Sequence, residues 1–113
     1  MDVKEISKNN GARIHTWDCH NMGNQRWILS YSGQDAILTA EHSNLSATMK
    51  NGETRNGTEL IQMPNQNETH QKFKIIPANG GFKIVNTKSG KCLDVQNSGK
   101  YNSAKIIQVK ICQ

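Results

Sequence analysis

The segment that decides the fold is Asn24-Gln25-Arg26-Trp27-Ile28-Leu29, because it recurs 46 residues later as His70-Gln71-Lys72-Phe73-Lys74-Ile75. In both copies an aromatic residue stands two positions after a Gln and opens a short apolar stretch. Trp27 and Leu29, like Phe73 and Ile75, fall on one face of an extended chain, and a period of two is typical of a β-strand. The segment therefore predicts a repeated strand unit and not an amphipathic helix.

The same spacing continues on both sides of this segment. Gly11-Ala12-Arg13-Ile14 falls on Gly57-Thr58-Glu59-Leu60, and Met1-Asp2-Val3 falls on Ala47-Thr48-Met49 and again on Leu93-Asp94-Val95. We divide the chain into copies at 1–46, 47–92 and 93–113, with one residue inserted in the third copy so that Ile107, Val109 and Cys112 fall on Ile14, Thr16 and Cys19. One such unit cannot bury its own apolar face, so three units closing on a shared axis are expected.

Composition excludes several classes of protein. The 113 residues suffice for one domain, and the net charge of +5 comes from scattered Lys and Arg, unlike the concentrated basic patch of a nucleic-acid binder. No apolar run approaches the roughly 20 residues of a membrane span. The four His show no metal-ligand spacing, and no triad or carboxylate pair stands out. We expect no catalytic residues, no metal and no cofactor.

Three motifs resemble one known family. Gln25-Arg26-Trp27 and Gln71-Lys72-Phe73 are similar to the Q-x-W signature of ricin-type lectin domains. Two further segments resemble other parts of that repeat, namely 89–95 (SGKCLDV) and 11–19 (GARIHTWDC). The resemblance covers nearly the whole chain and implies an all-β fold, the β-trefoil, in which Trp27 and Phe73 fill the core.

The resemblance also implies that the trefoil is incomplete. Three copies of 46 residues would need 138, so the 113 residues hold about ten of the twelve strands. In this family the Cys of the C-L-D segment bridges to the Cys of the W-D-C segment, which implies a Cys92–Cys112 disulfide and leaves Cys19 free. Either the native chain is longer, or a partner, such as a second copy in a homodimer, supplies the missing strands.

The family pattern places a ligand site in the first copy at Asp2, His15, Trp17, Asn24 and Gln25. Its equivalent in the second copy has lost both the carboxylate and the aromatic ring and is expected to be dead; the residues there are Thr48, Ile61, Met63, His70 and Gln71. In the third copy Asp94 and Gln108 match, although Lys110 replaces the aromatic residue and only Tyr101 could offer a ring.

The functional hypothesis is a lectin-like module that recognises galactose-like or xylose-like glycans and is not an enzyme, although it could belong to a larger glycosidase or toxin. We expect carbohydrate as its partner, with neither nucleic acid nor membrane insertion. We expect secretion, with a signal peptide lying outside this chain because residues 1–5 do not resemble one. The alternative is a protein-binding trefoil whose sugar sites have degraded.

Overall fold

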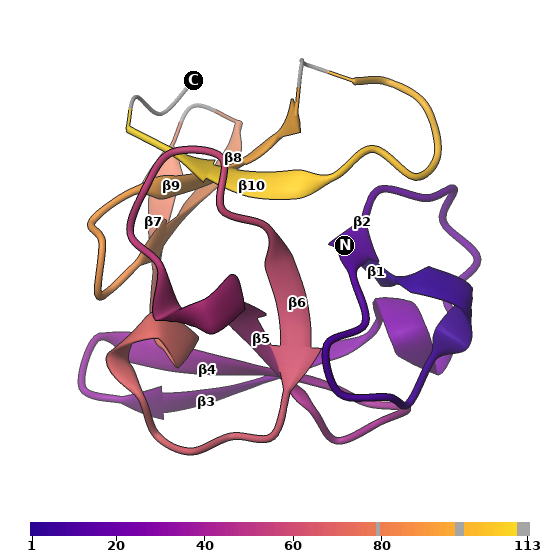
Figure 1. The fold of residues 1–113 in the computed structure, drawn as a ribbon, viewed down its shortest axis with the longest axis horizontal. Helices are drawn as coiled ribbons and strands as arrows, with labels where there is room; N and C mark the ends of the chain where they lie inside the picture. Colours follow the sequence, from indigo (N-terminus) through magenta and orange to yellow (C-terminus); the bar gives the residue numbers. More distant parts are fainter. Residues whose placement is uncertain (79, 97–98, 111–113) are drawn as a thin grey trace.

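The computed structural model describes residues 1–78, 80–96 and 99–110 as short strands joined by turns and single-turn 3-10 helices (Figure 1). The elements in these ranges are, in order, β1 (Asp2–Val3), η1 (Lys4–Ile6), β2 (Ile14–His15), η2 (Gly23–Gln25), β3 (Trp27–Ser32), β4 (Asp35–Ala40), β5 (Ser46–Met49), η3 (Lys50–Gly52), β6 (Leu60–Met63), η4 (Thr69–Gln71), β7 (Phe73–Ala78), β8 (Gly81–Asn86), β9 (Cys92–Val95) and β10 (Ile106–Val109). The predicted all-β class is confirmed.

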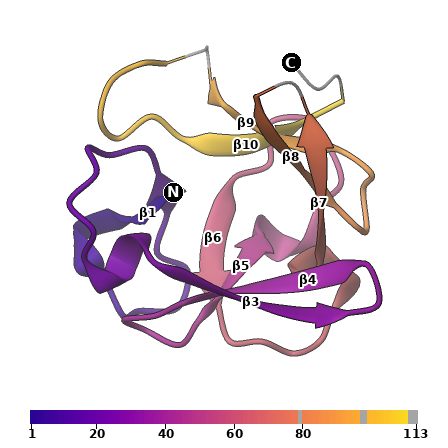
Figure 2. The ribbon, with the colours of Figure 1, turned by 180° about the vertical axis from the view of Figure 1, so that it is seen from behind.

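The strands repeat in threefold fashion. The strand pairs β1–β2, β5–β6 and β9–β10 are antiparallel and place the equivalent residue pairs Val3↔Ile14, Met49↔Leu60 and Val95↔Ile106 opposite one another. The hairpins β3–β4 and β7–β8 form the next level and contact each other through Ala36↔Phe73. Figures 1 and 2 show the two hairpins on different sides of the molecule's core, with β5 and β6 crossing the centre.

This register shows that the expected insertion in the third copy was wrong. Ile106, and not Ile107, is equivalent to Ile14, so the offset of 46 residues holds through β9 and β10. Backbone geometry agrees: Gly11, Gly57 and Ser103, each 46 residues apart, all have positive φ angles of +84°, +87° and +70°. The tight turn before each second strand requires this conformation, for which Gly is suited.

Buried hydrogen bonds repeat with the same spacing. The Gln62 side-chain amide donates to the carbonyls of Ser7 and Asn9, and the Gln108 amide donates to those of Glu53 and Arg55. Both Gln residues are completely buried. Each buried amide therefore pairs with two carbonyls in a loop of the preceding copy, which links one copy to the next.

The three copies contact one another through the equivalent residues that precede β2, β6 and β10. Arg13, Glu59 and Lys105 occupy equivalent positions in the three copies, and the Glu59 carboxylate lies 3.7 Å from the Arg13 guanidinium and 2.8 Å from Lys105 Nζ. The Lys105 hydrogen bond, followed by the Lys105 and Arg13 charges, lowers the pKa of Glu59. Backbone bridges at this end link His15 to Lys105 and bring β2 next to β10 (Figure 1).

The core contains the repeated apolar positions together with Phe73. Its buried members are Val3, Ile14, Ala36, Leu38, Ala40, Ala47, Met49, Leu60, Phe73 and Ile106. Phe73 is 0 % exposed, as predicted, whereas Trp27 packs against the same cluster but is only partly buried. The prediction of two equivalent core aromatics is therefore confirmed for Phe73 and only partly for Trp27.

The cysteines are described in part. Cys92 is buried in β9, while Cys112 lies outside the described residues, so the Cys92–Cys112 disulfide stays a prediction. Cys19 is exposed and free, which confirms the expectation for that residue. In the described ranges no helix is long and apolar enough to cross a membrane.

Candidate functional site

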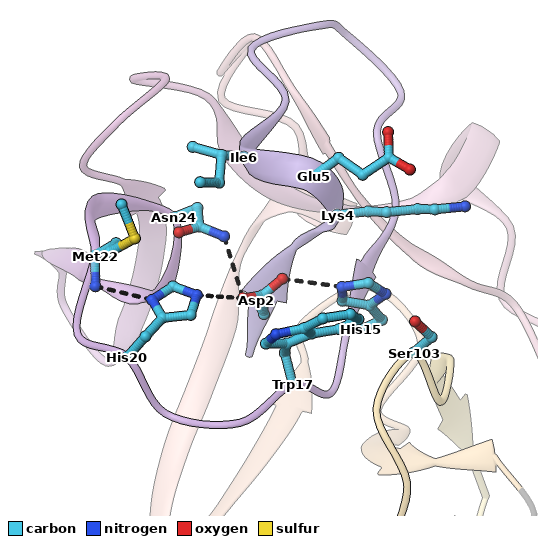
Figure 3. Close-up of a pocket in the computed structure, with 10 residues that line it drawn as sticks. All are labelled: Asp2, Lys4, Glu5, Ile6, His15, Trp17, His20, Met22, Asn24 and Ser103. Carbon is cyan, nitrogen blue, oxygen red and sulfur yellow. Dashed lines mark hydrogen bonds and ion pairs between the residues drawn. The ribbon is translucent and has the colours of Figure 1, made fainter.

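A pocket of about 420 Å³ opens beside β1 and β2 of the first copy (Figure 3). The residues around it come from both strands, the η1 turn, the 17–24 loop and the third copy. They are Asp2, Lys4, Glu5, Ile6, His15, Trp17, His20, Met22, Asn24 and Ser103. The site predicted for the first copy thus surrounds a cavity, and four of its five residues line that cavity.

Asp2 is the organising residue of this pocket. Its Oδ1 accepts a hydrogen bond from His15 Nε2 at 2.9 Å, and its Oδ2 accepts from Asn24 Nδ2 at 3.1 Å and from Gln25 Nε2 at 2.9 Å. The carboxylate is only 3 % exposed. A buried carboxylate needs such donors, because an unpaired buried charge is strongly unfavourable. The donors fix its orientation before any ligand arrives.

His20 is a member of the site that the sequence did not reveal. The Met22 backbone N–H donates to His20 Nδ1 at 3.1 Å, which leaves the ring proton of a neutral imidazole on Nε2. That nitrogen faces Asp2 Oδ2 at 3.3 Å (Figure 3). The carboxylate therefore lies between two imidazoles. No periodic signal could have identified His20, because the loop geometry alone brings it to Asp2.

The loop that carries His20 is held by Gln25. Its Oε1 accepts from the backbone N–H groups of His20 and Asn21, at 2.9 and 3.3 Å, while its Nε2 also donates to the Asp18 carbonyl at 2.8 Å. Gln25 thus ties residues 18–21 to the carboxylate of Asp2. Its role in the described geometry is to position the loop and the acid together.

Trp17 forms an accessible wall of the pocket. It is 46 % exposed, and its ring stacks on the buried His15 ring with centroids 5.5 Å apart and an interplanar angle of 20°. The His15 ring is in turn held by Asp2, so one face of Trp17 is supported and the rest is left to solvent or ligand. Such a fixed aromatic face suits contact with an apolar molecular surface.

The η1 turn opposite Trp17 has an unusual backbone. Glu5 and Ile6 have φ angles of +57° and +54°, in the left-handed region. A β-branched residue there is strained, and strain of this kind costs about 1–3 kcal/mol and concentrates at functional sites. In the second copy the equivalent positions are Asn51 and Gly52, which tolerate the conformation. Of these two copies, the first carries the strained apolar residue, beside the pocket of Asp2 and Trp17.

Two buried atoms of pocket residues lack partners among the described residues, His15 Nδ1 and Asn24 Oδ1. Buried polar atoms in folded proteins are nearly always paired with protein or water. His15 through Nε2 and Asn24 through Nδ2 both donate to Asp2. The free-energy cost of leaving these two atoms unpaired therefore accompanies the orientation that holds the carboxylate of Asp2 in place.

The second copy keeps the glutamine contact of the site but lacks its carboxylate and its aromatic ring. Gln71 Nε2 donates to Thr48 Oγ1 at 3.2 Å, which repeats the Gln25–Asp2 contact with a hydroxyl in place of the acid. Ile61 and Met63 stand where the first copy has His15 and Trp17. His70 replaces Asn24, and burial, followed by the Lys88 charge, lowers its pKa.

The third copy does not bring its two predicted site residues together. Asp94 is opposite Ile107, and Gln108 is one position further along β10. Gln108 is fully buried, with its amide engaged by Glu53 and Arg55 and its Oε1 accepting from Ser89. The corrected register gives Val109 the position of Trp17. We therefore leave Asp94 and Gln108 out of the candidate site.

His15, His20 and Asp2 lie close together, and imidazoles and a carboxylate are side chains that commonly bind metal ions. Within residues 1–78, 80–96 and 99–110, however, no group of three or more His, Cys, Asp or Glu side chains is placed to hold an ion. The two imidazoles are arranged to donate to Asp2. The described geometry is that of a hydrogen-bonding pocket.

Comparison with known proteins gives one family. The sequence profile described as "Ricin-type beta-trefoil lectin domain-like" matches residues 1–63 and 33–109. No curated protein matches the sequence significantly.

Solved structures share the fold. The designed threefold-symmetric protein ThreeFoil is 28 % identical, with a TM-score of 0.94 over 98 % of this chain and 81 % of its own. The exo-β-1,3-galactanase 1,3Gal43A from Clostridium thermocellum is 26 % identical, with a TM-score of 0.90 over 95 % of this chain and 24 % of that enzyme. The Rhizoctonia solani agglutinin, at 19 % identity, has a TM-score of 0.87 over 97 % of this chain and 76 % of its own.

Proposed function

Because the chain belongs to the ricin-type β-trefoil lectin-like family, we propose that it is a carbohydrate-binding module whose working site is the pocket of the first copy. The observation that supports this most is the buried carboxylate of Asp2, held in one orientation beside the exposed ring of Trp17. Family membership indicates a binding module. Several fold neighbours are parts of longer proteins, so attachment to an enzyme or toxin is a proposal as well.

The geometry fits the two kinds of surface that a pyranose presents. The aromatic face of Trp17 can stack on the apolar C–H face of the ring. Each oxygen of a carboxylate has about two acceptor sites. The described contacts place one donor on Oδ1 and three on Oδ2, so Oδ2 has more donors than sites while Oδ1 keeps one site. A sugar hydroxyl can therefore donate to the remaining site on Oδ1, or replace His20 at Oδ2. Hydrogen bonds to an ionised acceptor are the stronger kind and give epimer selectivity.

We propose galactose-like or xylose-like glycans as the ligand class. Both offer an apolar ring face of the size of one indole together with neighbouring hydroxyls. The likeness to a domain of an exo-β-1,3-galactanase supports the galactose-like member. A single shallow site of this type should bind with a Kd near millimolar, or about −4 kcal/mol. Avidity would then come from several modules acting together. Secretion and homodimerisation stay predictions.

The test compares three variants with the unmodified protein on a glycan array and by titration with free sugars. Trp17→Ala removes the stacking face from an exposed position, and Asp2→Asn removes the charge with little change in shape. Met63→Ala is the matched control, because Met63 is the second-copy equivalent of Trp17. Circular dichroism establishes that each variant is folded.

We expect Trp17→Ala and Asp2→Asn each to weaken binding by at least about tenfold, which corresponds to about 1.4 kcal/mol. Met63→Ala should bind as the unmodified protein does. Equal losses of binding in Trp17→Ala and Met63→Ala would show that the sugar does not bind specifically in the pocket of the first copy. Silence of the unmodified protein across a broad panel would contradict sugar binding and favour the alternative, a trefoil that binds protein.

A further inference from the structure

The pocket of the first copy is bordered on one side by a loop of the third copy. Ser103 lies in this loop and lines the pocket, although the other residues around the pocket belong to the first copy. Its side chain is exposed. In the part of the chain that the structure describes, no protein group hydrogen-bonds to the Ser103 hydroxyl. The hydroxyl can therefore serve a ligand without breaking a described contact of the fold.

The backbone at Ser103 is strained. Its φ angle is +70°, in the left-handed region, where the equivalent turns of the first and second copies have Gly11 and Gly57. A side chain is unfavourable in this region because its Cβ comes too close to the following carbonyl oxygen. Residues in such conformations persist where the surrounding structure imposes them, and they cluster at ligand sites. The third copy thus carries a side chain at a position where the other two copies have none.

The equivalent turns of the first and third copies differ in what lies next to them. The Gly11 N–H donates to the Gln62 carbonyl in the second copy, and the Ser103 N–H donates to the Thr16 carbonyl in the first copy. Gly11 therefore borders the second-copy position that has lost its acid and its aromatic ring, whereas Ser103 borders the position that keeps both. Of these two turns, the one beside the complete site carries the hydroxyl.

The loop that carries Ser103 is held against the segment that carries the site. The Ser103 N–H donates to the Thr16 carbonyl at 2.8 Å, and the Thr16 N–H donates to the Ala104 carbonyl at 3.0 Å. The Thr16 hydroxyl donates to the Tyr101 carbonyl at 2.7 Å and accepts from the Ala104 N–H at 3.1 Å. Because Thr16 immediately precedes Trp17, Ser103 has a fixed place beside the ring. Such preorganisation reduces the entropy that is lost when a ligand binds.

The pocket has polar groups at two ends. Figure 3 shows Asp2 on one side of the His15 ring and Ser103 on the other, with the Ser103 oxygen turned toward His15. The Trp17 ring, stacked on His15, lies between these ends. The volume of about 420 Å³ falls within the roughly 300–1,000 Å³ of pockets that enclose whole small-molecule ligands. A ligand that fills the pocket therefore meets an acid, an apolar stack and a hydroxyl in turn.

We propose that Ser103 is a specificity-determining residue of this pocket and that the ligand is a linked glycan of at least two sugar rings. The inference rests on the proposed function, which assigns sugar binding to the same pocket. One ring stacks on Trp17 and donates to Asp2, and the next ring meets the Ser103 hydroxyl. A hydroxyl has one donor and two acceptor sites, so it pairs with a sugar hydroxyl in either direction. The third copy thereby recognises the part of the glycan that the first copy does not reach.

The test measures Kd by NMR titration with two pairs of probes: galactose with β-1,3-linked galactobiose, and xylose with xylobiose. Ser103→Ala removes the hydroxyl and keeps the Cβ, while Ser103→Gly removes both. Gly11→Ser is the matched control, because it adds the same side chain to the equivalent turn, where a Cβ meets no atom within 4 Å. Hydrogen exchange of the residue-103 amide, which bonds to Thr16, establishes that the loop keeps its place.

We expect the unmodified protein to bind one disaccharide more tightly than its single sugar by at least about fivefold, or about 1 kcal/mol. Both Ser103 variants should lose this preference and bind the single sugar as before, because the Trp17 face and the Asp2 carboxylate are unchanged. Ser103→Gly should also raise the melting temperature, since glycine adopts the left-handed region readily. Gly11→Ser should lower the melting temperature and leave every Kd unchanged.

Equal affinity of the unmodified protein for each single sugar and its disaccharide would overturn the inference. So would a preference for the disaccharide that survives in both Ser103 variants. A preference lost in Ser103→Gly but kept in Ser103→Ala would overturn it too, because the Cβ and not the hydroxyl would then be responsible. In these cases single sugars still bind and the proposed function stands. If none of the four probes binds, the proposed function and the inference both fail.

Discussion

Ile6 and Gly52 occupy equivalent positions in the first and second copies and share a left-handed backbone, with φ angles of +54° and +65°. Gly52 adopts this conformation without cost, while the β-branched Ile6 does not. Ile6 borders the pocket beside Asp2, and Gly52 lies in a copy whose site has lost its acid and its aromatic ring. Of these two copies, the strained residue thus lies in the one that keeps the acid and the aromatic ring.

Ile6→Gly should therefore separate stability from binding. Relief of the backbone strain is expected to raise the free energy of unfolding by about 1 kcal/mol, less the contacts of a side chain that is already exposed. The pocket loses an apolar wall, so sugar binding should weaken. Urea denaturation and sugar titration measure the two effects. A variant that is both less stable and unchanged in binding would contradict this reading of η1.

Phe73→Ala should destabilise the protein more than Trp27→Ala does. Phe73 is completely buried, so its truncation leaves a cavity and should cost about 3–5 kcal/mol. Trp27 is partly exposed, and its truncation should cost about 2 kcal/mol. Thermal and urea denaturation give both values, with Tyr31→Ala as a near-neutral control on an exposed residue. The reverse order would show that Trp27 is the better-packed ring.

Gln62→Ala should disrupt the link between the first and second copies. The amide serves the carbonyls of Ser7 and Asn9, and its oxygen accepts from Ser43. Loss of this buried donor leaves the carbonyls unpaired, at a cost of about 1–3 kcal/mol. Gln66→Ala, at an exposed position, is the control for urea denaturation. Equal stability of the two variants would mean that water replaces the Gln62 amide.

Because the pKa of Glu59 is lowered in the folded protein, we expect the protein to lose stability in acid. The pKa of Glu59 lies below the usual value of 4.5, chiefly because Lys105 donates to its carboxylate. A lowered folded-state pKa means that the unfolded chain takes up the proton first. The contribution of Glu59 is therefore complete above pH 4.5 and is lost as the pH falls from there through the folded-state pKa.

Urea denaturation as a function of pH tests this contribution. Glu59→Gln should lower stability at neutral pH and flatten the decline that begins as the pH falls below 4.5, where the unfolded chain takes up the proton before the folded protein does. Glu41→Gln, a change in an exposed ion pair with Arg26, should leave the decline as it is. An unchanged slope in Glu59→Gln would show that other carboxylates govern the acid transition.

Much of the fold could be predicted from spacing alone. The offset of 46 residues between Trp27 and Phe73 specified repeated strand units, and the structure extends it to Ile14, Leu60 and Ile106. The third copy was misaligned by one residue because Ile106 and Ile107 are chemically identical. A slip of one position exchanges the two faces of a strand. Only pairing with Val95 decides which Ile enters the core.

The sequence by itself determined the repeat and the strand class, because both follow from local period and equivalent position. The clustering of Asp2, His15, Trp17, Asn24 and Gln25 was implied by the resemblance to the ricin-type lectin family. Tertiary structure alone decided that His20 reaches Asp2, that Gln108 is committed to the carbonyls of Glu53 and Arg55, and that Trp27 is less buried than Phe73. Each depends on which neighbour lies across a loop or strand edge. Such contacts between distant segments are set by the closure of the whole chain, and no local pattern encodes them.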